Sequence, residues 1–404
     1  MPQRRFHVIS LTLALLATAV TAAPAAEITC LKCHEKEQAL YIPSAHAQAG
    51  LTCMDCHGGD PKATDMTAHA TDNFKRPDNK KAIAELCASC HGDVRRMNPY
   101  GMPTDQLDRY KTSKHGEQLF EHNDQKVAVC IDCHGVHDIL KVKSPQARVY
   151  PTNIPQTCGR CHGDAKLMQE YKLPTDIVTQ YKSSYHAYMV FEKGDLSAPT
   201  CVTCHGSHGA TPPGTKEVGE VCGKCHVRQR ELFAKSPHAE AASAGLFNEC
   251  VSCHGNHGIQ KASVELYAKS CVQCHAKDPK QLQVRDKVAG LIERAQNDYS
   301  NAVTVVHAAT VRGLATDDEQ LLLQEAKTQV TQLEALQHTL AMDQLQPVAV
   351  HADEVVHQTL ADVGKLEQVE LWKRRALTPI WVFLAVMACL FWVKRRQVAR
   401  EDQP

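Results

Sequence analysis

The sequence predicts a mainly helical protein without a significant β-sheet. Three observations support this fold class. Residues 27–277 contain closely spaced cysteines with recurrent Gly and Pro, which favours short helices joined by loops. Residues 278–375 contain no cysteine and keep helical spacing of apolar positions, which predicts long helices. Residues 377–393 form an uncharged apolar run near the C-terminus, which predicts one transmembrane helix.

Nine copies of Cys-x-x-Cys-His contain 18 of the 19 cysteines. This spacing is the attachment signature of a c-type heme. The two thiols bond to the porphyrin vinyl groups, and the adjacent His is the proximal iron ligand. We therefore predict nine covalently bound heme c groups. The predicted thioether cysteines are Cys30, Cys33, Cys53, Cys56, Cys87, Cys90, Cys130, Cys133, Cys158, Cys161, Cys201, Cys204, Cys222, Cys225, Cys250, Cys253, Cys271 and Cys274. The predicted proximal ligands are His34, His57, His91, His134, His162, His205, His226, His254 and His275.

Other roles of Cys-x-x-Cys explain the pattern less well. Zinc would need two such pairs, or one pair and two histidines, around one tetrahedral ion. A thioredoxin-like redox pair would occur once, beside a βαβ pattern. Neither role, nor a disulfide scaffold, accounts for a His directly after every second Cys.

The cysteine-rich part consists of a leading motif and four repeats, each with two motifs. In each repeat a Ser-x-His precedes a Cys-x-x-Cys-His-Gly-x-His, and a plain Cys-x-x-Cys-His closes the repeat. The first repeat departs from this pattern, because Asp60 stands where the others have the last His. Residues 27–277 are thus predicted to form one nonaheme domain. Since aromatic residues make up only 5% of the chain, the porphyrins are expected to supply much of the apolar interior.

Nine further histidines in this region are candidates for the second, distal iron ligand. They are His46, His69, His115, His122, His137, His186, His208, His238 and His257. A heme with two protein ligands transfers electrons, whereas a heme with one can bind a small molecule. The His after Cys-His-Gly-x is too close to its own proximal His to reach the opposite face of the same iron. It must therefore serve a different heme.

The leading motif decides whether all nine hemes are closed. The repeats place eight distal ligands if His69 replaces the one missing at Asp60, which leaves His122 for the iron of His34. We expect His122 to close this heme. The alternatives are an open heme or a Met ligand such as Met97 or Met102, which would raise the potential.

The motifs from Ala26 to Lys277 resemble the multiheme c-type cytochromes of bacterial respiration, including the cytochrome c3-like and doubled-CxxCH groups. This resemblance implies mostly bis-histidine hemes of low potential, stacked as a wire. The long helices look like those of octaheme hydroxylamine oxidoreductases and pentaheme nitrite reductases. The Lys-ligated CxxCK heme typical of those nitrite reductases does not occur here. Single-span quinol dehydrogenases of the family usually have an N-terminal anchor, whereas the anchor predicted here is C-terminal.

The two ends of the chain predict export and anchoring. Residues 1–26 have the basic, apolar and small-residue regions of a signal peptide. Residues 278–375 are predicted to form a stalk of three helices, residues 376–394 a transmembrane helix and residues 395–404 a cytoplasmic tail. Because c-type heme is attached outside the bacterial cytoplasm, we expect the heme domain in the periplasm and the span in the inner membrane.

The stalk has its own sequence signals. Thr316 to Glu319 reads as a capping box that opens a second helix toward Leu345, and Pro347 is expected to separate the third helix. The stalk histidines are expected to be exposed or hydrogen-bonded. They are His307, His338, His351 and His357.

Together these features favour electron transfer over catalysis. The expected function is a membrane-anchored respiratory relay that works with a quinone-reactive or other integral membrane subunit and with periplasmic redox carriers. The rival functions are a reductase of nitrogen or sulfur oxyanions with one open heme, and a filament-forming cytochrome. Without the signal peptide and tail the chain has more acidic than basic residues, and the propionates add negative charge. This argues against nucleic acid as a partner.

Overall fold

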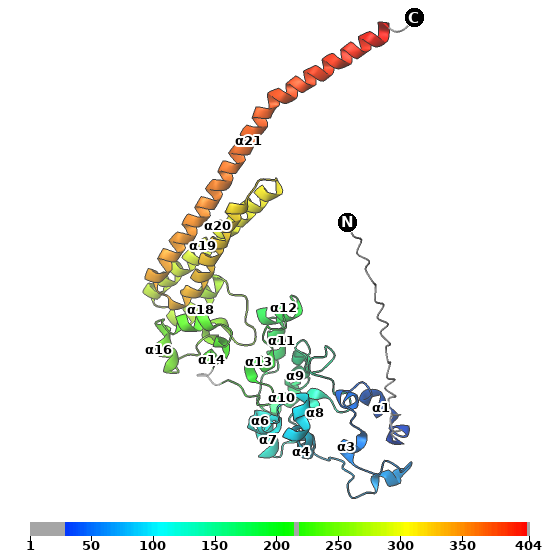
Figure 1. Ribbon diagram of the computed structural model, residues 1–404. Helices are drawn as coiled ribbons and strands as arrows, with labels where there is room; N and C mark the ends of the chain where they lie inside the picture. Colours follow the sequence, from blue (N-terminus) through cyan, green and yellow to red (C-terminus); the bar gives the residue numbers. More distant parts are fainter. Residues whose placement is uncertain (1–28, 214–217, 402–404) are drawn as a thin grey trace, which may run out of the picture. The chain divides into compact units, whose positions relative to one another are not determined.

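The computed structural model describes residues 29–213 and 218–401, and within these ranges it is mainly helical and contains no strand (Figure 1). The predicted fold class is therefore confirmed. The predicted signal peptide lies outside the described residues. The chain divides into two compact units. The first comprises Met1–Asp108 and His115–Tyr150, and the second comprises Arg109–Lys114 and Pro151–Pro404.

The cysteine-rich part consists of short helices joined by turns. The helices of the first 150 residues are η1 (Thr29–Lys32), α1 (Glu35–Tyr41), α2 (Ala45–Gln48), α3 (Cys53–His57), η2 (Met66–His69), α4 (Lys80–His91), α5 (Val94–Met97), η3 (Asn98–Tyr100), α6 (Gln106–Thr112), α7 (Lys114–Phe120) and α8 (Cys130–His134). Those that follow are α9 (Ile154–His162), α10 (Ala165–Glu170), α11 (Ile177–Lys182), α12 (Tyr185–Phe191), α13 (Cys201–His205), α14 (Val218–Gly223), α15 (Val227–Phe233), α16 (His238–Ser243), α17 (Val251–His254) and α18 (Glu265–His275).

One backbone hydrogen bond recurs between successive repeats. The donor is the backbone N–H of the middle residue of Ser-x-His. The acceptor is a backbone carbonyl in the next repeat, on the second residue after its Cys-His-Gly-x-His. The three examples are Ala45 to Ile139 at 2.7 Å, Lys114 to Ala210 at 3.1 Å and Tyr185 to Ile259 at 2.7 Å. The preceding serines are buried, and Ser44 and Ser184 each accept from a backbone N–H at 3.1 Å, which caps a helix. The sequence repeat is therefore also a structural repeat.

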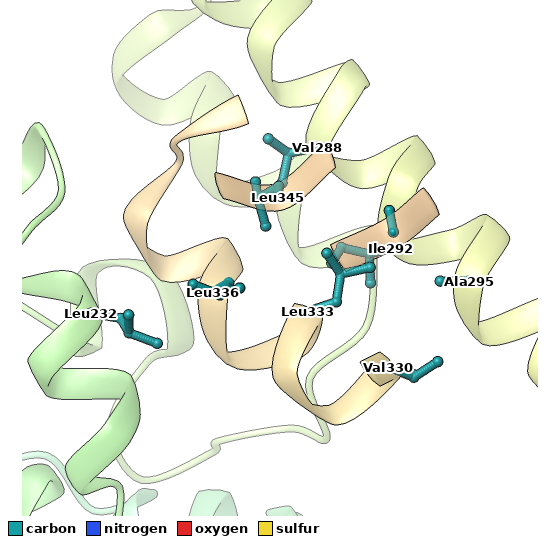
Figure 2. Close-up of a cluster of buried hydrophobic side chains, with 9 residues drawn as sticks. Leu232, Val288, Ile292, Ala295, Val330, Leu333, Leu336 and Leu345 are labelled. Atoms are coloured by element: carbon teal, nitrogen blue, oxygen red, sulfur yellow. The ribbon is translucent and has the colours of Figure 1, made fainter. Parts of the chain in front are cut away.

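Three long helices follow the last motif, as the sequence predicts. They are α19 (Pro279–Val311), α20 (Asp317–Leu336) and α21 (Met342–Glu401), with the short η4 (Gln337–Thr339) between the last two. One apolar cluster lies at the end of the bundle that includes η4, and Figure 2 shows Leu333, Leu336 and Leu345 packed there with Val288 and Ile292. A second cluster joins the three helices farther along, toward the α19–α20 turn. The predicted helical spacing of α19 thus corresponds to its buried face.

The structure corrects two details of the predicted stalk. The second helix ends at Leu336, and Pro347 lies inside α21 rather than before it. Thr316 is the N-cap residue of α20, but its hydroxyl bonds to Thr310 Oγ1 at 2.6 Å instead of closing a capping box. The nearby threonine competes for the hydroxyl, and a four-residue pattern does not reveal such a tertiary neighbour.

The predicted membrane segment is the distal part of α21. This helix of 60 residues continues without a break from the bundle into the apolar run, and its orange-to-red part extends beyond α19 and α20 (Figure 1). The apolar residues of this distal part, such as Trp381 and Phe391, are exposed. Within the described ranges, α21 is the one helix long and apolar enough to cross a membrane. The third stalk helix and the predicted span are therefore a single element.

Candidate heme-binding site

Every attachment motif has its proximal His at the end of a short helix or in the turn after it. In the first motif of each repeat, the helix ends at a glycine with positive φ. These glycines are Gly58 at 65°, Gly135 at 93°, Gly206 at 86° and Gly255 at 74°. The glycines after the plain motifs, Gly92 and Gly163, have ordinary negative φ. The positive φ turns the chain sharply after the proximal His, so the following His leaves its own motif.

The arrangement of the imidazole rings provides a test for heme. A ring nitrogen bonds a metal ion at about 2 Å and lies about 1 Å from its ring centroid, so two imidazoles on opposite faces of one metal have centroids about 6 Å apart. Seven of the nine proximal histidines have a second imidazole at 5.9 to 6.4 Å. These seven pairs fit bis-histidine ligation.

The pairs within the repeats follow two rules. The Ser-x-His of a repeat faces the proximal His of the plain motif in the same repeat, as in His46–His91 at 6.0 Å, His186–His226 at 6.4 Å and His238–His275 at 6.0 Å. The His of Cys-His-Gly-x-His faces the first proximal His of the preceding repeat, as in His57–His137 at 6.3 Å and His205–His257 at 5.9 Å. The structure therefore brings His137 and His257 to a motif other than their own.

The leading motif has a different neighbour from the one expected. The ring facing His34 is His69, with centroids 6.1 Å apart, whereas His122 is exposed. His69 lies at the end of η2, held against Phe74, and its Nδ1 is buried without a hydrogen-bond partner among the described residues. A buried imidazole nitrogen without a partner is costly, and metal ligation by the ring is one way to use it. The ring geometry therefore favours His69 over His122 as the candidate distal ligand of the leading motif.

A histidine outside the predicted set completes the seventh pair. His338, in η4 between α20 and α21, faces His254 with centroids 6.3 Å apart. The expectation of a hydrogen-bonded stalk histidine holds for its Nδ1, which contacts the Ala335 carbonyl at 3.0 Å. Sequence reasoning missed its position because no repeat surrounds it. The other stalk histidines are exposed, and among them His351 and His357 contact carboxylates.

Two proximal histidines, His134 and His162, remain. The repeats also leave two candidates, His115 in a Ser-x-His and His208 in a Cys-His-Gly-x-His. Both stand at positions whose equivalents in other repeats are paired. All four take part in interactions within the protein. Two candidate distal ligands thus remain for two proximal histidines, so the count does not require His122.

Hydrogen bonds orient several of these rings for metal binding. The Nδ1 atoms of His57, His205 and His338 contact the carbonyls of Lys75 at 3.0 Å, Thr211 at 3.3 Å and Ala335 at 3.0 Å. A carbonyl only accepts, so Nδ1 carries the proton and Nε2 keeps its lone pair. Metal-ligating histidines are held in the same way by a backbone carbonyl.

Burial keeps many of the imidazoles neutral, which is the form that binds iron. Desolvation is the main cause in each case, because the interior disfavours the charged ring. Burial lowers the pKa of His46, His91, His137, His162, His186, His238, His254, His257 and His338.

The attachment cysteines of successive motifs lie next to each other. Thiols are within hydrogen-bonding reach in four pairs, namely Cys30 with Cys53, Cys87 with Cys130, Cys158 with Cys201 and Cys222 with Cys250. Porphyrins bonded to such neighbours would lie close together. None of the 19 cysteines, all of which lie in the described residues, forms a disulfide. Over the described residues, no three His, Cys, Asp or Glu side chains converge as a metal-ion site.

Two family models match parts of the chain. The model for cytochrome c3 matches residues 45–162, and the model for cytochrome c554 and c-prime matches residues 221–296. Searches of curated proteins and of solved structures gave no match. The two family matches support a multiheme c-type cytochrome with covalently bound heme c, as the motifs predict.

Proposed function

We propose that this protein relays electrons along nine covalently attached c-type hemes, with α21 as its membrane anchor. One observation carries the proposal: seven proximal histidines each face a second imidazole at the spacing of two ligands across one iron. Bound heme supplies reversible one-electron chemistry. With heme bound, the two imidazoles of each pair would hold the iron from both faces and would leave no position for a substrate.

The arrangement of the ligands also favours transfer between hemes. His137 and His257 each face a motif of the preceding repeat, and the neighbouring thiols bring successive attachment points close together. Close, rigidly held centres suit electron hopping. The count of nine rests on the nine motifs and on the two histidines, His115 and His208, that match the remaining proximal ligands by position in the repeat.

The rival function, a reductase with one open heme, is less well supported. A reductase would need an open heme, and the leading motif was the candidate because the repeat pattern supplies no distal ligand near His34. With His69 facing His34 at 6.1 Å, the leading motif has the same ligand arrangement as the others.

The length of α21 constrains the membrane partner. From Met342 to Leu377 the helix spans about 50 Å, at about 1.5 Å per residue. The turn η4, which carries the last candidate ligand, therefore lies much farther from the start of the apolar run than the distance that one electron transfer between cofactors can cover. A quinone-reactive subunit in the inner membrane would need its own redox centre that reaches the periplasmic hemes. The span serves as an anchor rather than as a conductor.

Electron paramagnetic resonance of the oxidised, full-length protein tests the relay. Bis-histidine hemes give low-spin signals only, and cyanide or nitrite should leave the spectrum unchanged. A high-spin signal of about one heme equivalent that disappears on adding cyanide would overturn the relay in favour of a reductase.

A further inference from the structure

We infer that the helical stalk is the C-terminal cap of the heme array, and that its His338 is the distal ligand of the heme attached at Cys250 and Cys253. This inference rests on the proposed heme function and deepens it. It assigns a ligand to a residue in a region that contains no heme motif. It also gives the stalk a role besides carrying the anchor.

The repeat pattern leaves a gap at this position. The first proximal His of a repeat takes its partner from the next repeat, as His205 does from His257. His254 is the first proximal His of the last repeat, so no following repeat exists to supply a partner. The chain must provide this ligand from elsewhere or leave the iron open.

His338 occupies the missing position with the geometry of the other ligands. Its ring lies 6.3 Å from that of His254 with an interplanar angle of 23°, close to the 5.9 Å and 19° of His205–His257. The Nδ1–H donates to the Ala335 carbonyl at 3.0 Å, which leaves Nε2 as the free donor atom. The equivalent hydrogen bond orients the proximal His205.

The turn that carries His338 is firmly built. The Thr339 hydroxyl donates to the Leu336 carbonyl at 2.8 Å and accepts from the Ala341 N–H at 3.1 Å. The neighbouring Gln337 accepts a hydrogen bond from Tyr267, which lies in the helix of the last motif. Leu232 of α15 is buried in the same apolar cluster as the stalk residues, as Figure 2 shows. The turn is therefore held by the last repeat, through Tyr267, and by α15, which precedes that repeat.

The last repeat also lacks the group that would bind another repeat. In the other three repeats, the residue before the ligand His donates its N–H to the next repeat, as Tyr185 does to Ile259. In the last repeat this residue is Pro237, which has no N–H. Terminal units of repeat proteins characteristically replace such propagating contacts with a cap.

The test replaces the proposed ligand in the full-length holoprotein. His338→Ala should convert one heme from low-spin to high-spin in electron paramagnetic resonance, and added imidazole should restore the low-spin signal. His257→Ala, which removes a ligand inside the array, should give the same one-heme change. His307→Ala, an exposed histidine on α19, is the control and should change nothing.

Each outcome decides the assignment. If His338→Ala shows the spectrum of the His307→Ala control, the inference is wrong, while a low-spin wild type would still support the relay. A high-spin heme already present in the wild type would count against the relay instead. Should His338→Ala fail to accumulate, His338→Met keeps a ligand of similar length. Its heme should then show the near-infrared band of methionine-ligated iron and a raised potential, and absence of both would refute the assignment.

Discussion

Gly255 allows the backbone turn behind cross-ligation to be tested without changing a ligand. This residue follows the proximal His254 and has φ 74° and ψ −172°, a region that is almost exclusive to glycine. An added Cβ would meet no other protein atom within 4 Å, so the main effect of Gly255→Ala on the polypeptide is backbone strain. Holding a non-glycine residue there costs about 1–3 kcal/mol. We expect the free energy of unfolding to fall by that amount.

The matched control is the same substitution at Gly290 in the middle of α19. Its Cβ would also meet open space, but its backbone is helical, so Gly290→Ala should raise the free energy of unfolding by about 0.5–1 kcal/mol. Guanidinium titrations followed by the visible absorption of the hemes would measure both values. Equal shifts of the same sign, or no loss for Gly255→Ala, would refute the reasoning that the glycine conformation is required after the first motif of each repeat.

Two further predictions concern the cofactor count and the anchor. Intact mass of the mature protein should correspond to nine covalent hemes, and eight or fewer after full maturation would contradict the motif count. Truncation after Gln368 should release a soluble protein with an unchanged heme spectrum, because the second stalk cluster ends at Val363 and the Arg312–Glu367 ion pair is kept. The truncated protein should also lose reduction by quinol in membranes, and pelleting with membranes would show that something else holds it.

The local parts of this structure were predictable because they depend on covalent spacing. Cys-x-x-Cys-His predicts where a porphyrin attaches, and the His of the repeated Ser-x-His faces a predicted proximal His in three repeats. The face of α19 followed from helical spacing, since Val288, Ile292 and Ala295 recur on one side and are buried. In each case the signal lies within a few residues of the feature that it predicts.

The features that escaped prediction depend on tertiary neighbours. Thr316 begins a capping-box sequence, yet its hydroxyl bonds to the Thr310 hydroxyl across the turn that joins α19 to α20. His338 has no repeat around it and looks like any helix histidine until the chain brings it to His254. His122 was needed as a ninth distal ligand when the histidines of the stalk were left out of the count.

The geometry favours a direction of ligation that the sequence alone did not indicate. His137 and His257 each face a motif of the preceding repeat, so in the proposed scheme the ligand that replaces Asp60 in the first repeat belongs to the leading motif, where His69 lies beside His34. The vacancy then falls at the opposite end of the array, at His254, where His338 lies. In the proposed ligand scheme, the first and the last vacancy are filled by histidines outside the repeat pattern, His69 and His338. The last repeat would then depend on the stalk for a ligand, which couples the helices that lead to the anchor with the heme attached at Cys250 and Cys253.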